Sequence, residues 1–154
     1  MSDSTDGRRV IARNRKALHE YAIVETWEAG IVLTGPEVKS IRAGRVSLAE
    51  AFARVERGEV WLHAMHVTPY DPASHFNSDP TRSRKLLLSR REIRKLIGAT
   101  RQEGFTLVPL DLYLRRGYVK LTLALGRGKR HADKREDLKR RDAEREIQRA
   151  VRGS

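Results

Sequence analysis

The side chains best suited to chemistry in this sequence are histidines, serines and acids, and their spacing argues against catalysis. His63 and His66 are three positions apart, and residues at odd separation in a strand point to opposite faces, so a shared metal ion is not expected. Ser, His and Asp are all present, but without a nucleophile elbow. The run from Gly126 to Lys129 lacks P-loop spacing. The sequence therefore predicts no enzyme activity and no metal or cofactor site. It predicts that 126–129 is a flexible, basic segment through which the chain leaves the folded domain.

Positive charge gathers at the C-terminal end, where the available chemistry is phosphate binding. Residues 127–152 carry eleven Lys or Arg against six Asp or Glu, a net charge of +5. Their large apolar side chains are only Leu138, Ile147 and Val151. A helix with so few apolar groups cannot be held on a core. The segment is therefore either a solvated tail or a helix completed by a polyanion.

The rest of the chain is basic as well. The net charge is +12 over 154 residues, so residues 1–126 carry +7. Such a field attracts phosphate polymers and anionic membranes alike. The absence of cysteine excludes disulfides and thiolate metal sites. No run approaches the roughly 20 apolar residues of a membrane-spanning helix, and the N-terminus lacks the apolar stretch of a signal peptide. We therefore expect a cytoplasmic protein.

Local signals place two short helices in the chain. Thr34 and Glu37 form a capping box, and the helix that they begin should end at Gly44. Ser89 and Glu92 form a second box. The helix that follows this box has an apolar face and a basic face, the latter made of Arg90, Arg91, Arg94 and Lys95.

The remaining signals are those of strands and turns. Residues 1–13 are small, polar and then basic, and are expected to be flexible. A strand is expected at 21–28, followed by a bend at Ala29–Gly30. Two hairpins are expected, one that pairs 51–55 with 60–67 and one that pairs 107–114 with 118–125. A long loop is expected at 68–84, after the first hairpin. Six or so short strands, two capped helices and no βαβ pattern predict a mainly β fold, a closed antiparallel barrel.

Four separated segments of the sequence resemble the family of SsrA-binding proteins, also called small protein B. They occur in family order at compatible spacing, and they are NRKALHEY at 14–21, EAGIVLTGPEVKSIRAGR at 28–45, DPTRSRKLLL at 79–88 and GKRHADKREDLKRRDAEREI at 128–147. The resemblance runs from about Asn14 to Ala150. It implies an oligonucleotide-binding-fold barrel over 14–126, with two or three short helices and a basic tail over 127–154.

The resemblance also implies a function without catalysis. Members of this family bind the tRNA-like domain of transfer-messenger RNA and deliver that RNA to stalled ribosomes. Their tail is disordered in solution and becomes helical in the empty mRNA channel. The implied partners are transfer-messenger RNA and the ribosome, through the rRNA of the decoding centre and the mRNA channel. No membrane partner is implied, and a monomer is expected.

Motif positions carry the family's site residues onto this chain. The RNA-facing candidates of the barrel are Asn14, His19, Tyr21, Glu37, Lys39, Arg42, Arg84 and Lys85. The ribosome-binding candidates of the tail are Gly128, Lys129, Asp133, Lys134, Arg135, Lys139 and Arg141. Two of these have a structural alternative, because Glu37 and Asp133 are each placed to cap a helix.

Two other classes of protein remain open from the sequence. One is a general structural RNA-binding protein of the ribosomal type. The other is a membrane-surface protein that acts through its basic tail, although the sparse apolar face of the tail argues against insertion.

Overall fold

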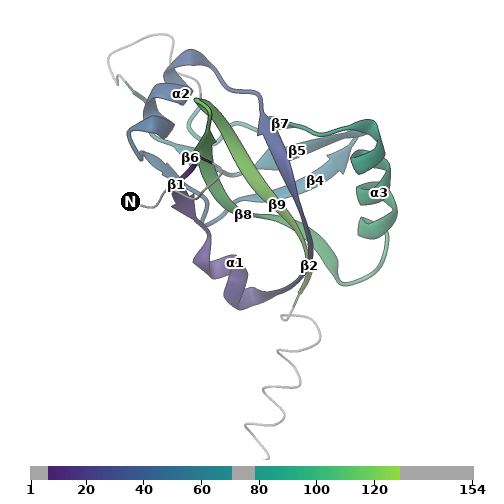
Figure 1. Ribbon diagram of the computed structural model, residues 1–154. Coiled ribbons are helices and arrows are strands. Elements are labelled where there is room, and N and C mark those ends of the chain that lie inside the picture. Colours follow the sequence, from purple (N-terminus) through teal and green to yellow (C-terminus); the bar gives the residue numbers. More distant parts are fainter. Residues whose placement is uncertain (1–6, 71–78, 129–154) are drawn as a thin grey trace, which may run out of the picture.

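The computed structural model describes residues 7–70 and 79–128 (Figure 1). Three helices form within these ranges, namely α1 Arg15–Glu20, α2 Gly35–Arg42 and α3 Arg90–Thr100. The strands are β1 Arg8–Arg13, β2 Tyr21–Ile31, β3 Val46–Ser47, β4 Phe52–Glu56, β5 Glu59–His63, β6 His66–Val67, β7 Arg84–Leu87, β8 Phe105–Arg115 and β9 Tyr118–Gly128.

Six of the strands close into a ring. The order is β8-β4-β5-β7-β2-β9, and β9 returns to pair with β8. Each of these pairings is antiparallel. The expected mainly β, closed antiparallel barrel is therefore confirmed. Three of its strands, β2, β8 and β9, have 11 residues each and are longer than the short strands expected.

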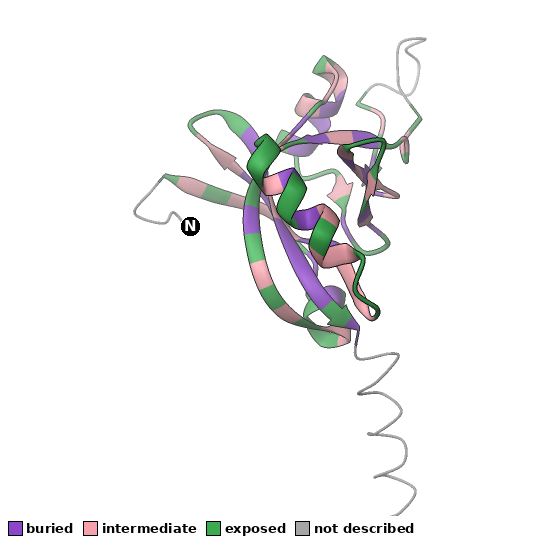
Figure 2. Ribbon diagram, turned by 90° about the vertical axis from the view of Figure 1, so that its right-hand side faces the viewer, coloured by how far each residue is buried: buried purple, intermediate pink, exposed green. Residues whose placement is uncertain are grey.

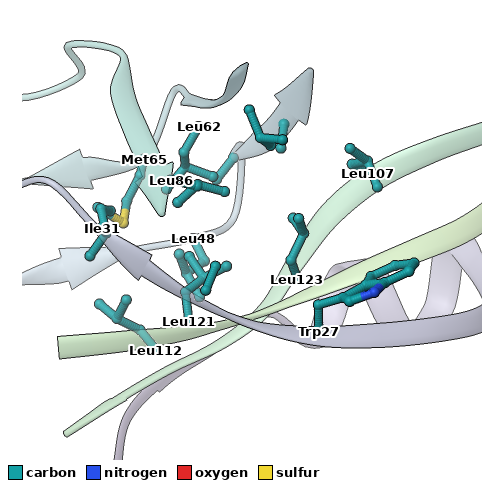
Figure 3. Close-up of a cluster of buried hydrophobic side chains, with 14 of the residues drawn as sticks. Trp27, Ile31, Leu48, Leu62, Met65, Leu86, Leu107, Leu112, Leu121 and Leu123 are labelled. Carbon is teal, nitrogen blue, oxygen red and sulfur yellow. The ribbon is translucent and has the colours of Figure 1, made fainter. Parts of the chain in front are cut away.

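Aliphatic side chains from all sides of the ring fill the barrel (Figure 3). The alternation expected along β9 is confirmed, because Val119, Leu121 and Leu123 are buried in this core. Complete burial of one such side chain contributes roughly 1.5–3 kcal/mol. Ala124, which belongs to the opposite face of β9, is also buried, in a second cluster with Ala17 of α1. Helix α1 therefore covers part of the outer surface of the barrel.

Both expected capping boxes are present. In α2, the Glu37 N–H donates to Thr34 Oγ1 at 3.3 Å, and the Thr34 N–H donates to Glu37 Oε1 at 2.9 Å. In α3, Ser89 and Glu92 make the same two bonds at 3.2 and 2.9 Å. Two of the orphan N–H groups at each helix start are thereby satisfied.

The N-terminal segment differs from the expectation of flexibility over Arg8–Arg13. These residues form β1, which pairs with the second half of β8 from Arg8↔Arg115 to Arg13↔Asp111. Helix α1 follows at once and was not expected either. Basic residues at both ends of the short apolar run in β1 give it the composition of a solvated tail, whereas its pairing partner lies about a hundred residues further along the chain.

Three glycines also differ from the expectation. Gly30 does not end the strand, because it pairs with both Lys120 of β9 and Leu87 of β7. Gly126 and Gly128 do not form a flexible exit, since both pair with β2 as part of β9. A Cβ on Gly126 would lie 2.9 Å from the Cβ of Tyr21. Glycine therefore lets the two strands approach closely at this end of the barrel.

Candidate nucleic-acid interface

Asn14 is a buried anchor for α1. Its side-chain oxygen accepts from the Ala17 N–H at 3.1 Å, as an N-cap, and its amide nitrogen donates to the Pro109 carbonyl at 2.9 Å. Its backbone N–H donates to the Leu110 carbonyl at 2.7 Å. The acceptors Pro109 and Leu110 lie in β8 at the point where its pairing register with β9 shifts. The structure therefore gives Asn14 the task of holding α1 on the barrel and leaves it little surface for RNA.

Of the other two candidates of this segment, Tyr21 lines a cleft. His19 is exposed on α1, and Tyr21, which begins β2, is partly buried. A cleft of about 310 Å³ lies between α1, the start of β2 and β4, and Lys16, Tyr21 and Arg54 are among its lining residues. Glu20 and Glu50 line it as well, and Lys16 Nζ lies 3.5 Å from Glu50 Oε1. The cleft is therefore of mixed charge and is not by itself a phosphate site.

Helix α2 presents the cationic candidates Lys39 and Arg42, both exposed. Arg42 Nη2 donates to the Gly117 carbonyl at 2.9 Å and so ties the end of α2 to the β8–β9 turn. Lys39 Nζ lies 5.5 Å from the centre of the Tyr70 ring. Each group keeps solvent-accessible N–H donors for a phosphate, because a single bond or ring contact does not saturate it.

Glu37 and Arg84 lie beneath this surface instead of on it. The side chains of Glu37 and Arg84 are 6% and 0% exposed. Arg84 Nε donates to Glu37 Oε2 at 2.7 Å, and Arg82 donates to both carboxylate oxygens through Nε at 3.1 Å and Nη2 at 2.6 Å. The expectation that Glu37 and Arg84 face RNA conflicts with this burial. The alternative of a capping role for Glu37 is confirmed.

The buried Arg84 guanidinium also donates hydrogen bonds to three backbone carbonyls. Nη1 donates to the Met65 carbonyl at 2.8 Å and to the Arg82 carbonyl at 3.1 Å, while Nη2 donates to the Pro80 carbonyl at 3.1 Å. The arginine therefore joins α2, the segment between β5 and β6, and the approach to β7. It supports the surface that carries Lys39 and Arg42.

The electrostatics of this centre follow from its contacts. Burial alone raises the pKa of the Glu37 carboxyl. Hydrogen bonds from Arg82, the Thr34 N–H and Arg84 outweigh burial, so the pKa of Glu37 lies below its ordinary value. The carboxylate is therefore ionised at neutral pH and balances two guanidinium groups.

The last barrel candidate, Lys85, is partly exposed on β7. Its Nζ lies 2.6 Å from Glu59 Oε2 on the neighbouring β5. Of the tail candidates, only Gly128 lies within the described residues, where its N–H donates to the Gly104 carbonyl at 3.0 Å. The others, Lys129, Asp133, Lys134, Arg135, Lys139 and Arg141, lie outside the described residues, as does the proposed cap at Asp133.

Sequence reasoning missed two exposed rings close to α2. Tyr70, beside Lys39, is 48% exposed, and Tyr118, beside the Arg42 partner Gly117, is 71% exposed. Exposed rings among cations are typical of surfaces that stack on unpaired bases. Composition gave no sign of which tyrosines would be exposed, because exposure depends on the turn that each one occupies.

A second missed feature is a polar cluster around Tyr113. This side chain is fully buried and donates a hydrogen bond to Glu28, which also accepts from Arg115 Nη1 at 2.7 Å. The Arg8 guanidinium carbon lies 4.0 Å from the centre of the ring. The Tyr113 bond is the main cause that holds the pKa of Glu28 below its ordinary value; burial opposes it.

His63 and His66 lie in different strands, β5 and β6. His63 Nδ1 is 2.7 Å from Ser83 Oγ, and His63 Nε2 is 2.8 Å from Glu56 Oε1, so both ring nitrogens are engaged. His66 is exposed in β6. Among residues 7–70 and 79–128, no cluster of three or more His, Cys, Asp or Glu could hold a metal ion. In the same ranges, no helix has the length and apolar character needed to cross a membrane.

Comparison with known proteins identifies the family. The sequence profile of the SmpB protein family matches residues 11–153. The chain belongs to the SmpB protein family. The SsrA-binding protein of Bacillus subtilis (strain 168) is 60% identical over 146 residues, which cover 95% of this chain and 94% of the relative. The SsrA-binding protein of Geobacillus sp. (strain WCH70) is 60% identical over 144 residues, with coverage of 94% and 93%.

A solved SmpB structure agrees with this placement. It is described as "tmRNA-SmpB: a journey to the center of the bacterial ribosome" and superposes with a TM-score of 0.67 at 50% sequence identity. The match covers 82% of this chain and 92% of the other. The family match also extends through the basic C-terminal segment, to residue 153.

Proposed function

We propose that this SmpB protein is a non-catalytic, cytoplasmic RNA-binding factor of trans-translation. It binds the tRNA-like domain of transfer-messenger RNA as a monomer and delivers that RNA to stalled ribosomes. Residues 127–154 enter the empty mRNA channel and contact rRNA there. The observation that carries this proposal is the family match over residues 11–153, which includes both the barrel and the basic segment.

The barrel contacts are assigned to what we call the α1–α2 surface. It consists of Lys39, Arg42, Tyr70 and Tyr118 around α2, and of His19 on α1, near the opposite end of β2. Lys39 and Arg42 contact phosphates, and the exposed rings stack on unpaired bases. Asn14, Glu37 and Arg84 act indirectly, by holding the helices that present this surface. Each phosphate contact contributes to the salt dependence of binding, with a slope of about 0.9 per contact in a plot of log K against log salt.

Two experiments test this scheme. The first is to purify the protein from cells and sequence the RNA that accompanies it, for which transfer-messenger RNA is the expected main species. Bulk rRNA without that enrichment would support a general ribosomal-type RNA-binding protein instead.

The second experiment separates the two binding regions. Lys134→Ala with Arg135→Ala should leave affinity for transfer-messenger RNA nearly unchanged and stop peptide tagging on ribosomes stalled at a truncated message. Lys39→Gln with Arg42→Gln removes the same charge from the barrel and should weaken binding of the isolated RNA. Equal loss of RNA affinity in both variants would contradict two separate regions.

A further inference from the structure

The exposed side of α3 is a second concentration of positive charge. Arg90, Arg91 and Arg94 of the helix and Arg101, its C-cap, are all exposed. At 100° per residue these four fall within an arc of about 100° and extend over about 16 Å of helix length. We name this set the α3 arginine face. Figure 2 shows α3 on the side turned to the viewer, with exposed stretches along it.

Nothing in the described part of the chain neutralises this face. None of its four guanidinium groups makes a hydrogen bond or ion pair with a residue of 7–70 or 79–128. Glu92, the acid within the helix, is held by the Ser89 N–H of the capping box at 2.9 Å. Lys95, about 40° beyond the arc, is paired with Glu25 at 2.7 Å. The four arginines are therefore available to an external anion.

Gly98 lies inside the same arc and has no packing reason to be glycine. A Cβ added to it would meet no atom within 4 Å, and its backbone does not have a positive φ. Glycine is a poor helix former, so the fold itself gains nothing from it at this position. What glycine does provide is a low point between arginine side chains, at which another molecule can reach the helix backbone.

The chemistry of the face favours RNA over other anionic partners. Guanidinium groups bind phosphates in a bidentate way, and all four charges of the face are arginines. A membrane-binding helix would need apolar side chains to insert, and a protein interface would need an apolar or aromatic centre. The arc of 90, 91, 94, 98 and 101 contains neither.

The position of α3 makes this face separate from the α1–α2 surface. Helix α3 packs on β4 and β8, and Figure 1 shows it on the right of the barrel, whereas α1 and α2 lie to the left. We propose that the α3 arginine face is a second RNA-binding surface, which holds the phosphate backbone of a structured RNA while a different RNA segment occupies the α1–α2 surface. The identity of that first RNA rests on the function proposed above.

The test uses the full-length protein saturated with unlabelled tRNA-like domain and a labelled 20-base-pair RNA duplex as the probe. Arg91→Gln with Arg94→Gln should reduce the slope of duplex affinity against salt by about 1.8, because two phosphate contacts are lost. This variant should keep its affinity for the tRNA-like domain. Lys39→Gln with Arg42→Gln is the matched control, since it removes two charges from the other surface and should show the reverse pattern.

The outcomes are distinct. Equal loss of duplex affinity in the two double variants would mean that only net charge matters, and would overturn the proposal. Loss of affinity for the tRNA-like domain in the α3 variant, with duplex binding unchanged, would overturn it as well. If the control alone fails to weaken binding of the tRNA-like domain, the α1–α2 assignment is wrong and the α3 result stands.

Gly98→Gln tests close approach without any change of charge. The variant should raise the melting temperature and lower duplex affinity severalfold, because a long side chain then fills the low point among the arginines. Gly98→Ala adds only a methyl group and should raise the melting temperature with nearly unchanged binding. A stabilised Gly98→Gln protein that binds the duplex as well as the parent would overturn the role of Gly98.

The RNA that binds the α3 arginine face can be identified with a cleavage reagent tethered to one introduced cysteine. The chain has no cysteine of its own, so the reagent attaches only there. Gln102→Cys places the reagent at the end of α3, and Ala43→Cys places it at the end of α2 as the control. On stalled ribosomes that carry transfer-messenger RNA, cleavage from position 102 should fall in rRNA or in a part of transfer-messenger RNA that position 43 does not cleave. Cleavage from position 43 with none from position 102 would overturn the proposal.

Discussion

Replacement of Glu37 by glutamine should destabilise the protein far more than the loss of a helix cap would. Glutamine can occupy the same position of a capping box, so the bonds with Thr34 are kept. What is lost is the carboxylate that balances Arg82 and Arg84. Because Arg84 is fully buried, removal of its counter-charge costs about 3–5 kcal/mol, whereas loss of a cap costs about 1 kcal/mol.

The measurement is urea unfolding followed by the fluorescence of the two tryptophans, with linear extrapolation of the free energy of unfolding to water. Glu92→Gln is the matched control, because Glu92 occupies the same position in the α3 box and no hydrogen bond or ion pair joins it to an arginine in the described part of the chain. It should be nearly neutral. Thr34→Ala, which removes only the cap, should cost about 1 kcal/mol. A cost for Glu37→Gln no larger than that of Glu92→Gln would refute the buried-charge explanation.

The same network predicts acid sensitivity. The folded-state pKa of Glu37 lies below the ordinary value of 4.5. A depressed carboxyl pKa contributes stability that is fully present above the unfolded-state value and is lost as pH falls through the folded-state value. Stability should therefore decline below about pH 4.5 in the parent protein and decline less steeply in Glu37→Gln. Equal slopes in the two proteins would contradict this assignment.

Three further predictions concern stability. Asn14→Ala removes a cap and a buried hydrogen bond and should cost about 2 kcal/mol in urea unfolding; a cost under ~0.5 kcal/mol would remove Asn14 as the anchor of α1. Gly98→Ala should stabilise by up to about 1 kcal/mol, a rise of roughly 3 °C in the thermal midpoint, and a fall would show that Gly98 is needed by the fold. Burial, then a carboxylate hydrogen bond, raises the pKa of Tyr113, so the stability that it contributes is complete below about pH 10 and is lost at higher pH; Tyr113→Phe should show less loss between pH 9 and 11 than the parent, and equal loss would contradict this.

Several features of the fold were predictable because their causes are local. A capping box joins residues three positions apart, so Thr34 with Glu37 and Ser89 with Glu92 can be recognised in the sequence. The alternation of Val119, Leu121 and Leu123 repeats every two residues and marks the inner face of a strand. The excess of positive charge needs no structure to be counted. These signals were enough to predict the barrel, its two capped helices and a polyanionic partner.

The site was less predictable, because local sequence does not tell which charges are used inside the fold. The segment around Arg84 has the composition of an exposed basic patch, yet this arginine is completely buried. Its partners Glu37 and Met65 are 47 and 19 residues away, and only the closed barrel brings them together. By contrast, Arg91 and Arg94 lie on the basic face that the helical spacing predicted, and they remain exposed on α3.

The sequence by itself determined that the partner is anionic and where the periodic elements lie, since net charge is a sum over the residues and caps and alternation are properties of neighbouring residues. The tertiary structure alone decided which cations face solvent, where β1 pairs and why Gly126 must lack a side chain. The physical reason is that the environment of a side chain is made by strands that meet across the barrel, and their separation along the chain leaves no local pattern.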